Sequence, residues 1–247
     1  MSALELGLLG LTGVFTAMLT AMVGYGGGTI LMVVVLQFMP PAAAIPFHGL
    51  VQLVSNGWRV WLFRAHVGWH LAWRFLVLLP PGILLGLWVF QGISTPVLNL
   101  LIGLFVVGTL FTRHLKRFRG SDLPLWAFFP LGLVMGILNM LIGVVMPLMG
   151  AVTIRSELNK EGLIATLAFF SMAGHLAKMV AFGSIGFDFG AYLLPAAVLI
   201  PTVMVGGVLG KRMLGVFNER LFQIFFRLLL AGLGLKLALW DGARHLL

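Results

Sequence analysis

The chain has 247 residues, of which 60% are hydrophobic and only 9% are charged, whereas soluble domains carry about 25% charged residues. This composition excludes an ordinary soluble enzyme or binding domain, and apolar blocks of about 20 residues predict transmembrane helices rather than barrel strands. The net charge of +9 would suggest nucleic acid as a partner for a soluble protein, but in a membrane protein it marks cytoplasmic loops, so no nucleic-acid partner is expected.

The predicted elements form two similar series along the chain. The N-terminus, MSALELGLLG, lacks the basic residues of a signal peptide and is expected to belong to the mature protein. The first series is a glycine-interrupted segment followed by three continuous helices: 6–38, then 45–64, 70–91 and 96–113. A basic linker over 114–123 follows. The second series is an interrupted segment and three more helices: 124–153, then 161–183, 190–212 and 218–239. We expect one all-α transmembrane domain over 1–247, with repeats at 6–113 and 124–239.

Comparison of the chain with itself supports the two repeats. A shift of 119 residues aligns four positions of the first half with four of the second: Gly24 with Gly143, Gln52 with Ser171, Asn56 with His175, and Arg59 with Lys178. The identities are few, so chance similarity between two apolar halves is the alternative.

The distribution of basic residues predicts which loops face the cytoplasm. The loops at 64–74, 113–122, 155–160 and 211–220 hold 11 of the 16 Lys and Arg residues, and the positive-inside rule places them in the cytoplasm. Segment 124–153 then starts and ends on the cytoplasmic side, as a re-entrant hairpin does. By analogy segment 6–38 starts and ends outside. Each repeat is a broken hairpin plus three spans, and since three is odd, the repeats are inverted. The N-terminus is expected outside; Lys236 and Arg244 fit an external C-terminus poorly.

The interruption of the first segment is the stretch GYGGG, which comprises Gly24, Tyr25, Gly26, Gly27 and Gly28. Glycine lets a ligand approach the backbone, and exposed N–H groups at a helix break can bind a small oxyanion. The alternative is that these glycines only allow helices to pack closely, although packing glycines usually lie four residues apart. The counterpart in the second half, GVVMPLMG, keeps Gly143 but places Pro147 opposite Gly28.

A polar stripe runs along the helix predicted over 45–64. Spacings of four, three, one and three residues place its members on one helix face: His48, Gln52, Ser55, Asn56 and Arg59. The second half has Ser171, His175 and Lys178 on the matching stripe. Because no Asp or Glu lies within any predicted span, two buried cations predict an anionic ligand. The alternatives are that the cations reach outward to lipid headgroups and that the histidines only join helices by hydrogen bonds.

Three stretches of the sequence resemble the sulfite exporter TauE/SafE family. They are the 24–69 stretch beginning GYGGGTILMVVV, NKEGLIATLAFFSMAGHLAKMVAFGSIG over 159–186, and LPAAVLIPTVMVGGVLGKRM over 194–213. The resemblance implies export of a small sulfur-containing anion such as sulfite or a sulfonate, with the site on the glycines of 24–28 and the two polar stripes. The second hairpin departs from the expected pattern, with GVVMP in place of a glycine-rich run.

We therefore interpret the protein as a secondary transporter of the cytoplasmic (inner) membrane that exports sulfite or an organosulfonate by alternating access. An anion channel of the same fold and a proton-coupled importer are the alternatives, because His48 and His175 can carry a proton near neutral pH. A non-transporting subunit of a membrane complex is a further rival. No catalytic triad, carboxylate pair, metal motif or cysteine indicates an enzyme or a cofactor. The expected partners are the anion and membrane lipid, and a homodimer is left open.

Overall fold

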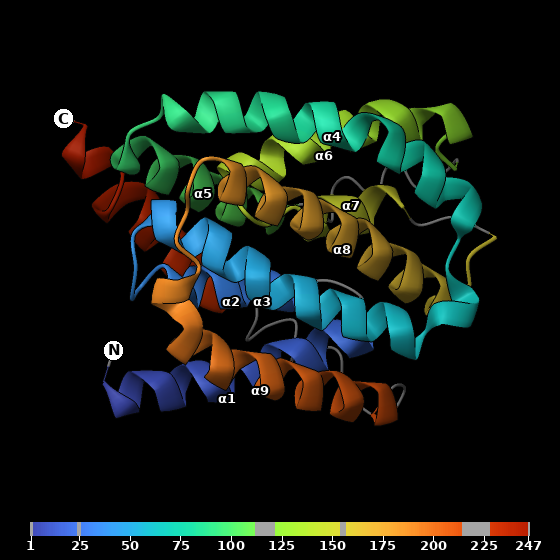
Figure 1. The fold of residues 1–247 in the computed structure, drawn as a ribbon, viewed down its shortest axis with the longest axis horizontal. Coiled ribbons are helices and arrows are strands. Elements are labelled where there is room, and N and C mark those ends of the chain that lie inside the picture. The colour runs from blue at the N-terminus through green and yellow to red at the C-terminus, as the bar shows by residue number, and fades with distance from the viewer. Residues whose placement is uncertain (1, 24–25, 112–121, 154–156, 214–227, 247) are drawn as a thin grey trace.

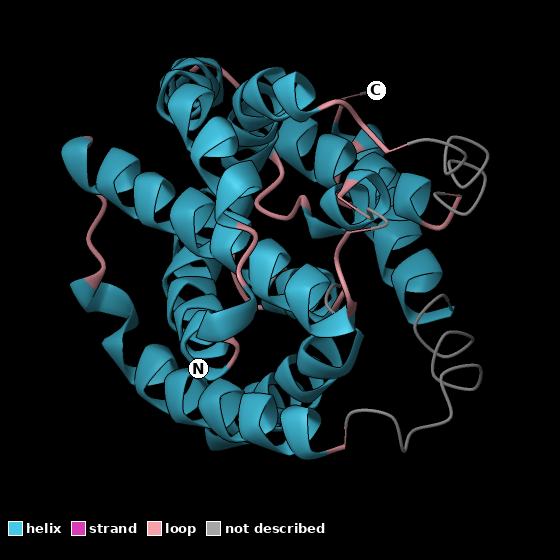
Figure 2. Ribbon diagram, turned by 90° about the vertical axis from the view of Figure 1, so that its right-hand side faces the viewer, coloured by secondary structure: helices cyan, strands magenta, loops and turns pink. Residues whose placement is uncertain are grey.

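The computed structural model describes residues 2–23, 26–111, 122–153, 157–213 and 228–246. Within these ranges the chain forms helices and loops without any strand (Figure 2). The axes of the long helices are roughly parallel or antiparallel to one another, and the N- and C-terminal ends of the chain lie at the same end of the molecule (Figure 1). The structure is therefore all-helical over its described parts.

The first half contains a broken segment followed by three longer helices. Gly26, with a φ of 103°, is the N-cap of the short second helix, so the break falls where the glycine run predicts it. Only glycine adopts such a φ without strain. The helices of this half are α1 (Ala3–Val23), α2 (Gly27–Val35), α3 (Pro41–Leu62), the 3-10 turn η1 (Arg64–His66), α4 (Trp69–Gln91) and α5 (Thr95–Thr109).

The second half follows the same order. Gly143, with a φ of 79°, lies in the break between its first two helices. The elements are η3 (Leu125–Ala127), α6 (Phe128–Leu141), α7 (Met146–Val152), α8 (Lys160–Ser184), η4 (Gly190–Tyr192) and α9 (Leu193–Arg212). The last described helix covers 228–240 and ends in the π-helical turn η5 (Lys236–Trp240), before η6 (Ala243–His245).

The helix ends differ from the sequence expectation by a few residues. Helix α3 begins at Pro41 rather than 45, because proline suits the first turn of a helix, where its missing N–H is not needed. Helix α5 ends at Thr109, before the expected 113. Part of the helix expected over 218–239 lies outside the described residues. Helices α2 and α7 begin 119 residues apart (146 − 27), as do α3 and α8 (160 − 41).

Four helices of the described chain are long and apolar enough to cross a membrane: Ala3–Met22, Trp69–Gln91, Lys160–Ser184 and Gly190–Arg212. Helix α3 has the length but carries the polar stripe, and Thr95–Thr109 and Leu125–Leu141 are shorter apolar helices. Helix α1, with 21 residues, is about 31 Å long at 1.5 Å per residue. The first hairpin thus has one arm of full membrane length and one arm, α2, of nine residues.

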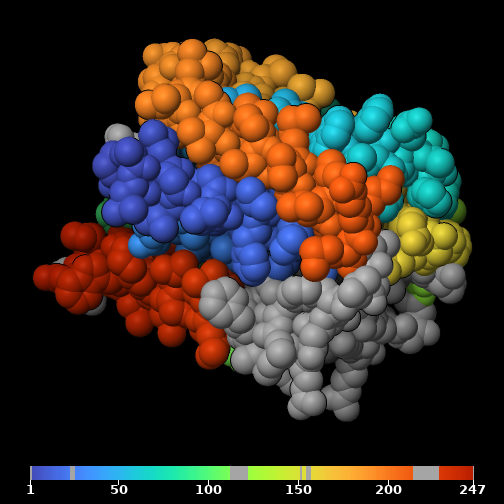
Figure 3. Space-filling view, turned by 90° about the horizontal axis from the view of Figure 1, so that it is seen from below, coloured from blue at the N-terminus to red at the C-terminus, as the bar shows by residue number. Residues whose placement is uncertain are grey.

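Helix α1 packs along α9, from the other half of the chain, and the two lie side by side on the face seen in Figure 3. Glycines of α9 make the close contact: a Cβ on Gly206 would overlap the backbone oxygen of Val14, and one on Gly210 that of Met18. These glycines are four residues apart, the spacing that lets transmembrane helices approach closely.

Helices α4 and α6 form the corresponding pair on the opposite side of the bundle (Figure 1). A Cβ on Gly82 of α4 would overlap the backbone oxygen of Leu133, and one on Gly132 of α6 that of Phe75. Each half therefore packs its first helix against the fourth helix of the other half.

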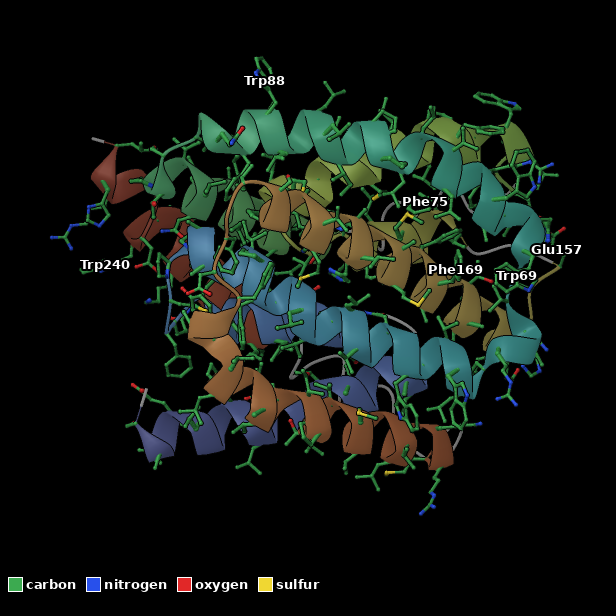
Figure 4. The ribbon with its side chains drawn as sticks, in the orientation of Figure 1. Trp69, Phe75, Trp88, Glu157, Phe169 and Trp240 are labelled. Carbon is green, nitrogen blue, oxygen red and sulfur yellow. The ribbon has the colours of Figure 1, made fainter. Side chains whose placement is uncertain are left out.

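Helices α3 and α8 pack against each other between these two pairs and run in opposite directions (Figure 1). Side chains on α4 distinguish the inside of the bundle from its outside. Phe75 is 2% exposed and points inward, whereas Trp88 is 75% exposed and points away from the bundle (Figure 4). Because α3 and α8 lie between the two helix pairs, most polar side chains of their two stripes are buried and do not reach the apolar outer surface.

Candidate functional site

A cavity lies between the two broken segments and the central helices α3 and α8. The space free of atoms among its lining residues is about 520 Å³ and includes space open to solvent. Both helix breaks and helices α1, α3, α4, α6 and α8 contribute to the lining: Thr20, Gly26, Gly28, Thr29, His48, Gln52, Asn56, Arg59, Phe75, Leu79, Met135, Asn139, Gly143, Val144, Val145, Met146, Phe170, Ser171, Gly174 and His175. The structure thus brings together, around one cavity, most of the residues singled out in the sequence.

The glycine run divides between lining the cavity and packing helices. Gly26 and Gly28 line the cavity at the N-terminus of α2. There the N–H groups of Thr29 and Ile30 donate to the backbone oxygen of Gly26, whereas those of Gly27 and Gly28 precede the first bond within the helix. Gly27 instead faces α1, where a Cβ would overlap the backbone oxygen of Thr16. Gly24 and Tyr25 lie outside the described residues.

Three residues of the α3 stripe form a chain of hydrogen bonds. Arg59 donates from Nη2 to Oδ1 of Asn56, which in turn donates from Nδ2 to Oε1 of Gln52 at 3.0 Å. Because each amide oxygen already accepts a bond, the orientation of both amides is fixed. The Nε2 group of Gln52 is left as a donor beside Gly28, 2.9 Å from where a Cβ on that glycine would stand.

Arg59 is buried inside the protein rather than extended over its outer surface. It is 4% exposed, and its Nη1 donates to the backbone oxygen of Thr20 in α1 at 3.2 Å. Its Nε has no hydrogen-bond partner among the described residues. The arginine therefore lines the cavity, and its Nε–H group is available to donate a hydrogen bond.

His48 connects α3 to the broken segment. Its Nε2 lies 2.9 Å from the backbone oxygen of Gly28, and its ring meets the ring of His175 edge to face, with centroids 5.8 Å apart. The expectation that the histidines join helices by hydrogen bonds holds for His48. Its Nδ1, however, is buried and has no partner within the described part of the chain.

Helix α8 brings Ser171 and His175 to the cavity wall opposite α3. Both are buried, at 5% and 6% exposure, and neither the Ser171 hydroxyl nor Nδ1 of His175 has a partner in the described ranges. Unpartnered buried polar groups are costly and uncommon. Four residues of α3 and α8 that carry such groups line this one cavity, where a bound polar solute would satisfy them: His48, Arg59, Ser171 and His175.

Lys178 lies behind the cavity wall. It is fully buried, and its Nζ donates to Oδ1 of Asn139 at 3.1 Å and to the backbone oxygen of Gly143 at 3.3 Å. Both acceptors are uncharged, and both Asn139 and Gly143 line the cavity. The lysine charge is therefore close to the cavity and lacks a carboxylate partner among these contacts.

The chemistry of the lining suits a small anion. None of the acidic residues in the described parts of the chain lines the cavity, whereas Arg59 does and Lys178 stands directly behind it. A buried charge requires a compensating partner. Within the described ranges no three His, Asp or Glu side chains gather as a metal site requires.

Sequence reasoning missed three polar residues of the cavity: Thr20, Thr29 and Asn139. Asn139 is 4% exposed inside an otherwise apolar helix, a signal that marks a polar residue facing the protein interior. It also lies 119 residues after Thr20 (139 − 20), so the repeat shift relates the two.

One protein-family model matches most of the chain. The model of the family described as sulfite exporter TauE/SafE matches residues 9–237. Comparisons with curated proteins and with solved structures find no match. The match extends over both halves of the fold and includes every residue of the cavity. The chain therefore belongs to the sulfite exporter TauE/SafE family of membrane transporters.

Proposed function

We propose that this protein is a secondary transporter that exports a small sulfur-containing anion, sulfite or an organosulfonate, across the cytoplasmic membrane by alternating access. The anion binds in the cavity between α3 and α8, against the N-terminus of α2. Arg59, Gln52 and Ser171 donate hydrogen bonds to it, and Lys178 supplies a second positive charge from behind the wall.

One observation carries this proposal: buried donors without partners meet around a cavity that no described carboxylate lines. The N-terminus of α2, which has no side-chain cap, adds a partial positive charge. An oxyanion satisfies both the unpaired charge and the unpaired donors. A neutral solute satisfies only the donors, and a cation satisfies neither.

Two inverted repeats would give the cavity access from both sides in turn. The repeat is supported by the offset of 119 residues that separates the start of α7 from that of α2 and the start of α8 from that of α3. The inversion is supported by the opposite directions of α3 and α8, and by the exchange of partners in which α1 packs on α9 and α6 on α4. In this proposal the two pairs rock about the central helices.

The membrane potential, negative inside, favours outward movement of an anion by about 2.3 kcal/mol per charge at 100 mV. Export of sulfite therefore needs no ATP. The sequence agrees with this, since it contains no phosphate-binding loop of the GxxxxGK[ST] type.

The test uses purified protein in detergent and in proteoliposomes. Sulfite, thiosulfate and small sulfonates are expected to raise the thermal unfolding temperature, and labelled sulfite is expected to exchange across the liposome membrane with saturation. Arg59→Ala and Gln52→Ala are expected to lose both effects. Ohmic currents in a planar bilayer would show that the protein is an anion channel and not a carrier. If both variants respond to anions as the parent does, the proposed site is wrong.

A further inference from the structure

The contact between His48 and Gly28 fixes which ring nitrogen of the histidine carries hydrogen. Nε2 lies 2.9 Å from the backbone oxygen of Gly28, and a carbonyl oxygen can only accept a hydrogen bond. Nε2 is therefore the donor. In the neutral ring Nδ1 is then a bare acceptor, and it is buried without a partner among the described residues.

This acceptor stands among donors. The cavity presents the Nε of Arg59, the Nε2 of Gln52 and the hydroxyl of Ser171, all able to donate to an anion. A fully deprotonated oxyanion has acceptors only, so it matches these groups but meets a lone pair at His48. The mismatch disappears when one proton lies between Nδ1 and an anion oxygen.

We propose that the anion is bound together with one proton, shared between Nδ1 of His48 and an oxygen of the anion. This inference rests on the proposed function and adds the protonation state of the bound substrate. A dibasic anion such as sulfite is then held as the equivalent of hydrogen sulfite. A sulfonate, which carries no hydrogen on oxygen, is held by a protonated His48. The proton comes from the buffered solvent: its bond to water or buffer breaks, and a bond to Nδ1 or to the anion oxygen forms. No other bond of the protein or of the anion changes.

The other charged or titratable groups near His48 do not offer the same acceptor. Arg59, on the same helix, is always charged and only donates. The amine of Lys178, on α8, is bonded to Asn139 and to the backbone oxygen of Gly143. Within the described part of the chain no contact fixes the tautomer of His175, so its Nδ1 can carry hydrogen and donate to the anion. Helix α2, which His48 also contacts, has no titratable side chain. The contact with Gly28 therefore makes Nδ1 of His48 a hydrogen-bond acceptor, whereas Nδ1 of His175 can be either a donor or an acceptor.

The experiment measures protons taken up when an anion binds to the purified full-length protein. Methanesulfonate is the main probe, because it does not itself titrate near neutral pH. Titration calorimetry in two buffers of different ionisation enthalpy, at about pH 8.5 where free imidazole is neutral, is expected to give about one proton taken up per anion. The dissociation constant is expected to rise about tenfold per pH unit above neutrality. Sulfite, a dianion at that pH, is expected to take up about one proton as well.

Three variants assign the proton to its residue. In His48→Gln the side-chain amide can still donate to Gly28 but cannot bind a proton, so methanesulfonate binding is expected to lose its proton uptake and its pH slope. His175→Gln, whose ring centroid in the parent lies 5.8 Å from that of His48, is expected to bind the anion more weakly but to keep the proton uptake per bound anion and the pH slope. Lys178→Gln is expected to do the same.

Anion binding without proton uptake in the parent protein would overturn the inference and leave the proposed function intact. Proton uptake that survives in His48→Gln but is lost in His175→Gln or Lys178→Gln would also overturn it, because another group would then hold the proton. If neither anion binds under any condition, the proposed function itself fails.

Discussion

Lys178 donates from Nζ to Oδ1 of Asn139 at 3.1 Å, and both side chains are buried between α8 and α6. The first half has a matching contact, in which Arg59 of α3 donates to the backbone oxygen of Thr20 in α1 at 3.2 Å. The partners in both contacts are separated by 39 residues. Each half therefore ties a cation on its central helix to the end of its first helix, beside the break.

The Lys178–Asn139 contact makes a prediction about stability. Asn139→Leu leaves the buried ammonium with only the Gly143 oxygen, and an uncompensated buried charge costs about 3–5 kcal/mol. Lys178→Met leaves only a neutral amide without its partner, at about 1–3 kcal/mol. We expect thermal unfolding in detergent to be lowered more by Asn139→Leu than by Lys178→Met. The double variant, with both polar groups removed, is expected to be more stable than Asn139→Leu alone. Additive losses in the double variant would show that the two side chains are not coupled.

Arg59 and Arg64 lie five residues apart and offer a matched pair for anion binding. Arg59 lines the cavity, whereas Arg64 is exposed and donates to the backbone oxygen of Trp61. Hydrogen bonds to charged groups contribute about 1.5–3 kcal/mol, so Arg59→Gln is expected to raise the dissociation constant for sulfite about 10- to 100-fold. Arg64→Gln is expected to leave it unchanged. Calorimetry on both variants tests this, and equal losses would place the anion elsewhere.

The sequence predicted the all-helical class, the two helix breaks and the polar stripe on α3, because each leaves a local trace. Glycine in a run interrupts a helix, and polar residues at spacings of three and four fall on one face. The structure indeed places Gln52, Asn56 and Arg59 on one chain of hydrogen bonds.

Other features of the site depend on contacts between distant parts of the chain and left no local trace. Gly26, Gly27 and Gly28 are three consecutive residues of the same type, yet Gly27 packs on α1 and the other two line the cavity. The difference arises because successive residues of a helix point about 100° apart. The pairing of α1 with α9 and of α6 with α4 joins helices far apart in the chain. Periodicity within one segment cannot identify such partners.

The absence of cysteine from the chain allows a direct test of the predicted topology. Ser94, between α4 and α5, and Ala65, between α3 and α4, are both exposed and lie at opposite ends of α4. With the N-terminus outside, Ser94→Cys is expected to react with a membrane-impermeant maleimide in intact cells. Ala65→Cys is expected to react only after the membrane is opened. The reverse pattern would invert the assignment of sides.

Gly27 and Gly28 form the sharpest matched pair, because the same added methyl group meets two different neighbours. At Gly27 it would overlap the backbone oxygen of Thr16, which can move only if α2 shifts away from α1. Overpacking of this kind costs about 1–3 kcal/mol, more than the roughly 1 kcal/mol that alanine gains over glycine within a helix. Gly27→Ala is therefore expected to lower the thermal unfolding temperature.

At Gly28 the added methyl group meets the Nε2 of Gln52 at 2.9 Å, at the end of a side chain that can rotate. Gly28→Ala is therefore expected to keep its thermal stability but to bind sulfite more weakly, because the Gln52 donor is displaced from the cavity. Unfolding temperatures measured without ligand, together with dissociation constants, separate the two effects. If Gly28→Ala binds sulfite as tightly as the parent, Gln52 does not donate to the anion. If Gly27→Ala is as stable as the parent, the contact between α1 and α2 is looser than the structure indicates.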